Sequence, residues 1–256
     1  MRCFPLTACC VAALWLAVYL APAPTATARP ESVASEATSG SVEAYRANLL
    51  TPDEERIVGR RLAHLYEQRC TLLKDELTEA RLKRIKRRLG AILAPGLSLQ
   101  VSVIQSARPE AVSFPPDSIY ITSALIRLTA TDDELAAVIA HEAAHVRCRH
   151  LARLIALVQA LPPAERPNFP TREAIVTGEA TQFDFPAAID AVRLRSEMEA
   201  DQLAALWIEQ AGYRDEALAV LLGRLMDRLA PRAQKERAAL RARMQSLDKQ
   251  SFSLSR

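Results

Sequence analysis

Glycine and aromatic residues are scarce in this sequence of 256 residues, and neither sign of charge is in large surplus. It has only 7 glycines and 5% aromatic residues, and its 33 basic side chains are nearly balanced by 30 acidic ones, for a net charge of +3. Few glycines leave few tight hairpins and favour a helix-rich fold, and the balanced charge argues against nucleic acid as a partner. With 50% hydrophobic and 25% charged residues, the composition excludes a disordered polymer, a collagen-like fibre and a polytopic membrane protein. It fits a single globular domain.

Long apolar runs are also missing, except for one at the N-terminus. Residues 4–20 are mostly apolar and are followed by small residues at 21–23 and 26–28. This pattern predicts a signal peptide over residues 1–28, cleaved after Ala28, and therefore an exported protein. An uncleaved anchor is the alternative, although about 20 apolar residues are wanted for a membrane span.

Behind this signal, residues 29–50 are predicted to be a flexible linker, and residues 51–256 a folded domain with a helical C-terminal extension. Of the five cysteines, only Cys70 and Cys148 would remain in the mature chain. An exported compartment permits them to pair, but two thiols do not make a disulfide without suitable geometry. We therefore expect free thiols.

Helices and a small sheet are predicted for the first half of the domain. The stretch Thr51–Glu54 has the residues of a capping box with proline in the first turn, which predicts a helix start. Residues 77–93 show the period of an amphipathic helix. Alternating apolar and polar residues predict a sheet of about three strands, over residues 97–103, 111–114 and 118–122. After Ser123 the patterns are helical.

One side of the helix predicted over residues 77–93 is strongly basic. Its basic residues are Arg81, Lys83, Arg84, Lys86, Arg87 and Arg88. A membrane-surface or nucleic-acid site is one interpretation. Because no aromatic residue interleaves them and the apolar stripe is regular, we favour a solvated helix face.

A His-Glu-x-x-His motif lies on a helix that is predicted to begin at a second capping box, Thr131–Glu134. His141 and His145 lie one turn apart and about 40° apart around the helix axis, so both imidazoles can reach one ion. Glu142 points too far round to ligate, but it is placed to take a proton from a water molecule at the metal. A pair of histidines satisfied within the core is the alternative. The motif predicts a hydrolytic zinc site, which needs a third protein ligand and one open position.

Candidates for the third ligand lie in an acidic stretch further along the chain. Glu197 and Asp201 are four residues apart and share a helix face, whereas Glu199 points to the other side. One of the pair can bind the metal while the other orients a ligating histidine through its free ring nitrogen. A surface ladder of salt bridges is the alternative.

These motifs together resemble one protein family. The matching stretches are Val112–Phe114, Ile119–Ser123, Asp133–Leu135, His141–His150 and Glu197–Asp201. They are similar to the zinc metalloendopeptidases of the HtpX, BepA and CAAX prenyl protease family, which is family forty-eight of the metallopeptidases, in the gluzincin clan. The resemblance implies a mostly helical α+β domain of zincin type, with a small sheet packed on the helix of the His-Glu-x-x-His motif.

The resemblance also assigns roles to the site residues. It implies one zinc ion per chain, bound by His141, His145 and Glu197. Glu142 would then be the general base, and Asp201 would orient a ligating histidine. The strand over residues 112–114 would be an edge strand, to which an extended polypeptide substrate pairs.

Two features point to the soluble, exported, BepA-like branch of the family. The prolines and charges of residues 161–185 leave no membrane span there, and His150 matches a histidine that these members often have. It lies about 140° from His145 on a regular helix, so packing or hydrogen bonding is favoured over metal ligation. This branch implies proteolytic quality control in the periplasm of a Gram-negative bacterium, with peripheral membrane or outer-membrane assembly contacts as further partners.

The C-terminal region departs from the family pattern. Exported members commonly carry a His-Pro pair whose histidine faces the metal, but this chain has Ala230 and Pro231 at that place. Tyr213 and Arg193 are the candidate substitutes. The departure keeps open a non-catalytic zinc-containing chaperone or assembly factor, although an intact Glu142 argues against it. An iron oxygenase with two histidines and one carboxylate shares the ligand set but does not explain Glu142.

Overall fold

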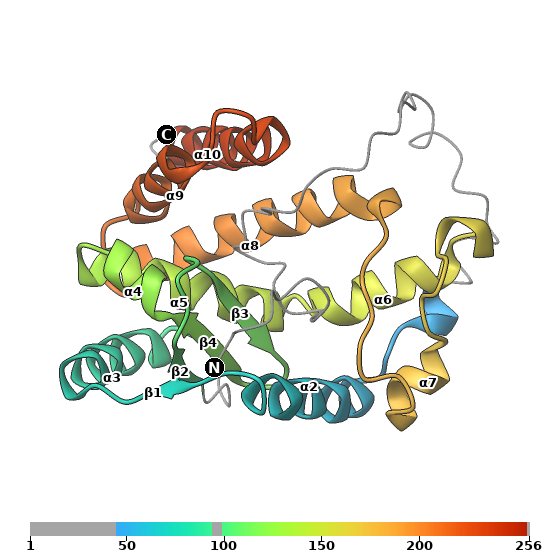
Figure 1. The fold of residues 1–256 in the computed structure, drawn as a ribbon. Helices are drawn as coiled ribbons and strands as arrows, with labels where there is room; N and C mark the ends of the chain where they lie inside the picture. The colour runs from blue at the N-terminus through green and yellow to red at the C-terminus, as the bar shows by residue number, and fades with distance from the viewer. Residues whose placement is uncertain (1–44, 94–98, 255–256) are drawn as a thin grey trace.

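A computed structural model describes residues 45–93 and 99–254, with side chains to residue 248 (Figure 1). The predicted signal peptide and residues 29–44 of the predicted linker lie outside these ranges. The rest of the expected linker is not flexible chain: residues 45–48 are helical and Leu50 is buried among apolar residues. The folded part of the chain therefore begins before residue 51.

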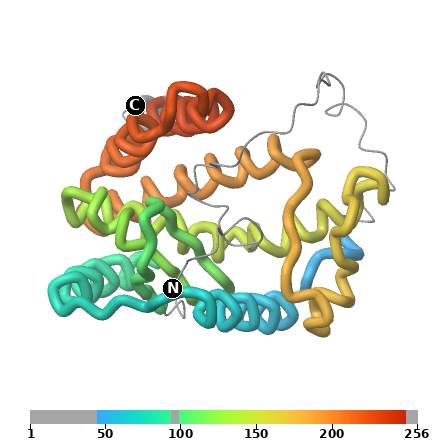
Figure 2. The backbone as a smooth tube through the Cα atoms, in the orientation of Figure 1, coloured from blue at the N-terminus to red at the C-terminus, as the bar shows by residue number. Residues whose placement is uncertain are grey.

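The predicted capping box at the first long helix is confirmed. Helix α2 spans Pro52–Glu67, and both reciprocal hydrogen bonds between Thr51 and Glu54 are present. Helix α3 spans Glu76–Gly90 and is capped by Asp75 instead. In Figure 2 the blue α2 runs beside α7, which spans Arg172–Thr177 and contacts it.

The basic side of α3 does more than face solvent, so our interpretation of it was partly wrong. Arg81 binds Asp132 through Nε at 2.7 Å, at the start of the next long helix. Arg88 donates from Nη2 to the carbonyl oxygen of Ala211 at 2.7 Å, and its guanidinium lies 3.9 Å from the ring centroid of Tyr213. These arginines, together with Arg84, which also binds Asp132, hold α3 against neighbouring elements, while Lys83 and Arg87 are exposed.

Within the residues that the structure describes, the sheet has four strands, one more than the sequence predicts. The strands are β1 (Leu72–Leu73), β2 (Gln100–Ile104), β3 (Ala111–Phe114) and β4 (Ser118–Thr122), in the order β1-β2-β4-β3. Only β2 and β4 are parallel. The added strand, β1, is two residues long, which is too short to show alternation. Strand β3 forms an edge of the sheet, as the family resemblance implies.

After β4, the regular elements of the described chain are helices, as predicted. They are α4 (Ser123–Leu128), α5 (Asp132–Arg147), α6 (His150–Ala160), α7, α8 (Asp190–Gln210), α9 (Ala217–Arg228) and α10 (Gln234–Leu254), with short 3₁₀ turns at Pro163–Glu165 and Ala187–Ile189. In Figure 1, α8 lies between α5 and the red pair α9 and α10, and it contacts α5 and α10. The fold is therefore α+β and mostly helical, with the sheet packed on α5.

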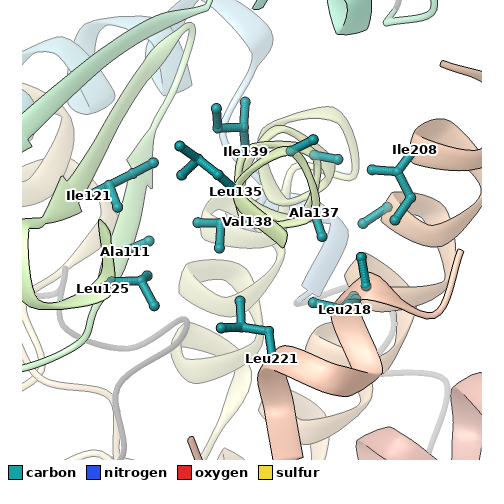
Figure 3. Close-up of a cluster of buried hydrophobic side chains, with 14 of the residues drawn as sticks. Ala111, Ile121, Leu125, Leu135, Ala137, Val138, Ile139, Ile208, Leu218 and Leu221 are labelled. Atoms are coloured by element: carbon teal, nitrogen blue, oxygen red, sulfur yellow. The ribbon is translucent and has the colours of Figure 1, made fainter. Parts of the chain in front are cut away.

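Helix α5 is the centre of the larger hydrophobic core. All its residues from Glu134 to His145 are buried, because the sheet, α3, α8 and α9 cover it from different sides. Figure 3 shows Val138 facing Ala111 of the sheet, while Ala137 faces Ile208 and Leu218 of the C-terminal helices. A helix that leaves no face to water must be enclosed in this way, and the enclosure places the metal-binding motif inside the core.

Helix α6 follows α5 after a sharp break. Arg149 adopts the left-handed conformation, with φ of 55°, and α6 begins at the next residue. Most of the apolar residues of Leu151–Val158 are buried in a second core cluster, so this segment packs internally. Within the described residues, no helix is long and apolar enough to cross a membrane, and no disulfide joins Cys70 to Cys148.

The break is held by an ion pair whose removal we expect to destabilise the fold. Nε of Arg149 lies 2.6 Å from Oε2 of Glu55, a buried residue of α2, and the guanidinium also binds the carbonyl of Leu50. Arg149→Ala leaves this buried carboxylate without its cation, which should lower the free energy of unfolding by about 3 kcal/mol. Urea denaturation measures this loss. Adding Glu55→Gln should recover part of it, and a double variant no more stable than Arg149→Ala would contradict the ion-pair explanation.

Candidate metal centre

Three predicted ligand side chains converge between α5 and α8. Nε2 of His141 lies 3.0 Å from Nε2 of His145. The carboxylate of Glu197 lies 3.5 Å from the first of these nitrogens and 3.6 Å from the second. The three residues are buried, and their donor atoms all lie within 4.8 Å of one another. The predicted ligand set is thus brought together by two helices that pack closely.

The donor atoms fit a tetrahedral zinc site. Bonds of about 2.0–2.1 Å to nitrogen or oxygen place neighbouring ligands of a tetrahedron about 3.3 Å apart, and the three observed separations lie close to that value. Among the described residues, Oε2 of Glu197 is also a buried atom with no hydrogen bond of good geometry. A buried carboxylate oxygen without such a bond is costly. A divalent cation at this point would satisfy it.

Asp201 stands behind His141, as predicted. Its Oδ1 lies 2.8 Å from Nδ1 of His141, and it is fully buried. Although burial opposes the change, the carboxylates of Asp201 and Glu197 raise the pKa of His141 to about 9. This part of the site therefore favours positive charge, which a zinc ion would supply.

Arg243 of α10 completes this arrangement, and the sequence analysis missed it. Its Nε and Nη2 donate to the two oxygens of Asp201, each at 2.7 Å. Its Nη1 lies 2.8 Å from Oε2 of Glu197, at ion-pair distance but without hydrogen-bond geometry. Burial acts to raise the pKa of Asp201, but the charge and hydrogen bonds of Arg243 and His141 lower it overall. Asp201 is therefore a carboxylate held between Arg243 and His141.

A signal for Arg243 was present in the sequence. It lies on the stripe that also carries Leu240 and Leu247, which are buried on α10, so a charged residue there needs a buried partner. The candidate substitutes for the family histidine, Tyr213 and Arg193, have other partners in the structure. Tyr213 stacks on Arg88, and Arg193 pairs with Asp190 of its own helix.

His150 stands behind His145. Because the chain breaks at Arg149, α5 does not continue regularly, and Nδ1 of His150 comes within 2.7 Å of Nδ1 of His145. Nε2 of His150 lies 3.3 Å from Oε2 of Glu199, which also accepts from Arg153 at 3.0 Å. Burial lowers the pKa of His150 to about 4, and burial together with the charge on His141 lowers that of His145. The predicted hydrogen-bonding role of His150 is confirmed.

Glu142 is buried beside the metal donors and is oriented by the sheet. Oγ of Ser113, on β3, donates to its Oε2 at 2.8 Å. Among the described residues, the other oxygen, Oε1, has no hydrogen-bond partner. Burial raises the pKa of Glu142 to about 7, a value suited to exchanging a proton with water near neutral pH. The arrangement can hold a metal ion and abstract a proton next to it.

The second capping box is only partly as predicted. Thr131 accepts from the backbone N–H of Glu134, but the Glu134 carboxylate binds the N–H of Ala130 and Nη1 of Arg224 of α9. The carboxylate therefore fixes α9 against the start of α5. Local sequence could not show this, because the arginine lies 90 residues further along.

Ser113→Ala is expected to slow hydrolysis without weakening zinc binding. Loss of the donor leaves Oε2 of Glu142 unpartnered and frees its carboxylate to rotate, which should lower kcat by roughly 10–100-fold. Because the serine donates to the charged form, its loss raises the pKa of Glu142, so the acid limb of the pH profile should move to higher pH. Ser102→Ala on β2 is the matched control, and equal kcat values for the two variants would contradict this role.

Comparison with known families agrees with the site. The model of the family described as peptidase family M48 matches residues 76–250, which extends from the start of α3 into α10 and includes all three metal donors. The comparison with curated proteins gave no match. The matched range is more than half of the chain and includes Arg243.

Proposed function

Since the chain belongs to peptidase family M48, we propose that it is an exported zinc metalloendopeptidase that hydrolyses peptide bonds of misfolded or envelope proteins. The observation that carries this proposal is the convergence of His141, His145 and Glu197 beside the free oxygen of Glu142. M48 membership makes the chain a metallopeptidase. The endopeptidase activity, the substrates and the cellular role are the proposal.

The residues of the site divide the chemistry between them. His141, His145 and Glu197 would hold one zinc ion. When bound, zinc supplies a Lewis acid that polarises the scissile carbonyl and lowers the pKa of water at the site to about 7. Glu142 takes the proton of the attacking water through its free Oε1 and passes it to the leaving amine. Asp201 holds the ring of His141 in place.

Strand β3 is the proposed binding site for the substrate backbone. It pairs with β4 on one side, and its other side carries no strand within the residues that the structure describes. An extended polypeptide can add to such an edge through main-chain hydrogen bonds. Ser113 belongs to this strand, so a peptide bond aligned along β3 would lie close to Glu142.

The proposed location rests on the predicted signal peptide. Cleavage after Ala28 would release the chain into the periplasm of a Gram-negative bacterium, where misfolded exported proteins and outer-membrane assembly components are the expected clients. An uncleaved signal would instead anchor the protein at the membrane. Fractionation of cells that express the full chain, with sequencing of its N-terminus, distinguishes the two.

Metal analysis and a cleavage assay test the activity. We expect the purified full chain to contain one zinc ion and to degrade casein, to stop doing so with a chelator, and to recover when zinc is restored. Iron in place of zinc would contradict the proposal. One zinc ion per chain without any cleavage would favour a client-binding factor that uses β3 to hold unfolded chains.

A further inference from the structure

The two imidazoles at the metal centre are supported in different ways. His141 meets a carboxylate directly, because Asp201 lies against its Nδ1. His145 instead contacts another imidazole, that of His150. A carboxylate, that of Glu199, follows only on the far side of the His150 ring. A ligating histidine usually donates its second N–H to a carboxylate, a carbonyl or water, so the support of His145 is unusual.

The direction of the hydrogen bonds follows from metal binding. To ligate through Nε2, His145 must carry its proton on Nδ1, and it then donates that proton to Nδ1 of His150. His150 can accept only if its own proton is on Nε2, which faces Oε2 of Glu199 at 3.3 Å. Glu199 is fixed in turn by Arg153. One series of donors and acceptors thus runs from the metal centre to the surface, where the Glu199 side chain is 46% exposed.

We propose that His150 and Glu199 are positioning residues that fix the tautomer and ring orientation of His145 for zinc binding. The inference rests on the zinc site of the proposed function but concerns residues outside it. The break at Arg149 is what makes it possible, because a continuous helix would carry the ring of His150 about 140° away from His145. The carboxylate–arginine pair of Glu199 and Arg153 then supports His145 as the pair of Asp201 and Arg243 supports His141.

A second metal ion on Cys148, His150 and Glu199 is the competing interpretation, since their donor atoms also lie close together. A metal on Nε2 of His150 would displace the proton that Glu199 accepts. The proton of His150 would then lie on Nδ1, and it would point at the proton on Nδ1 of His145, so that two donors would face each other. The cation of Arg153, 3.0 Å from the same carboxylate, also repels a metal ion. The geometry therefore favours the hydrogen-bonded series.

Zinc affinity of the full chain tests the proposal directly. His150→Leu removes the acceptor, and we expect its zinc dissociation constant, measured by competition with a chromophoric chelator, to rise by about 10–100-fold. His150→Asn keeps an acceptor at the position of Nδ1 and should recover most of this loss. Glu199→Gln, at a half-exposed position that does not endanger folding, should weaken binding in the same direction by a smaller factor. In the cobalt-substituted chain, the visible absorption bands should change in His150→Leu and return in His150→Asn.

Cys148→Ser is the matched control and should leave zinc affinity and stoichiometry unchanged. Unaltered affinity in both His150→Leu and Glu199→Gln, with folding verified by circular dichroism, would overturn the positioning role while leaving the proposed function intact. Two zinc ions per chain, one of them lost in Cys148→Ser, would overturn it in favour of a second metal site. A wild-type chain that binds no zinc would overturn both proposals.

Discussion

Glu142→Gln is expected to lose peptide-bond hydrolysis while keeping its zinc. The glutamine fills the same buried space and can still accept from Ser113, but it cannot take a proton from water. General-base catalysis of this kind contributes roughly 10²–10⁴-fold, so kcat should fall by that factor or to the background of the assay. Zinc content and casein cleavage, measured on the same preparations, separate the loss of the base from the loss of the metal.

The pH dependence of wild-type activity should also report the ionisation of Glu142. A general base works only when it is ionised, so activity should decline as the pH falls through the pKa of Glu142, which burial raises to about 7. A nearby zinc ion favours the carboxylate and moves this limb to lower pH. Glu209→Gln, an exposed change on α8, should alter neither kcat nor the pH at which the activity declines. Hydrolysis retained by Glu142→Gln would overturn the assignment.

Arg243→Leu should cause the second large effect, and its size should depend on zinc. Removing a guanidinium that is paired in the interior leaves the charges of Asp201 and Glu197 without their cation, at a cost of about 3–5 kcal/mol in the free energy of unfolding. Zinc bound to the same cluster supplies positive charge of its own. The loss should therefore be larger in zinc-depleted protein than in zinc-loaded protein, as measured by urea denaturation of both.

Two further variants on α10 make this test specific. Arg243→Lys keeps the charge but not the planar pair of donors that binds both oxygens of Asp201, so it should recover only part of the stability. Arg237 donates to the carbonyls of Met226 and Leu229 and, in the described part of the chain, to no carboxylate, so the loss in Arg237→Leu should not depend on zinc. If Arg243→Leu lowers the free energy of unfolding equally with and without zinc, the arginine contributes by packing and not by its charge.

The residues that sequence analysis identified are those whose roles depend on a regular helix. His141, Glu142 and His145 follow from spacing on α5, and the match of Glu197 with Asp201 follows from spacing on α8. The strands of four or five residues follow in the same way from alternation. Local periodicity carries this information because it needs no knowledge of what packs against the element.

The residues that were missed become functional only when distant segments meet. Arg243 is 42 residues from Asp201 in the sequence, and Ser113 is 29 residues from Glu142. No local motif predicts a contact between residues so far apart. The hydrogen-bonding role of His150 was predicted, but its partner, His145, was not, because the contact depends on a backbone break at Arg149, a residue type with no strong preference for the left-handed conformation. The basic side of α3 was misjudged for a similar reason, since its partners lie in α5 and in the turn after α8.

The enclosure of α5 also limits how this protein can vary. With every side chain from Glu134 to His145 covered, a saturation library over this segment should contain almost no neutral variants. Its alanines fit where neighbouring helices leave room for a single methyl group, at positions 136, 137, 140, 143 and 144. A larger side chain at any of them requires a smaller one on the element opposite. Divergence in this helix should therefore proceed by compensated pairs of substitutions rather than by single steps.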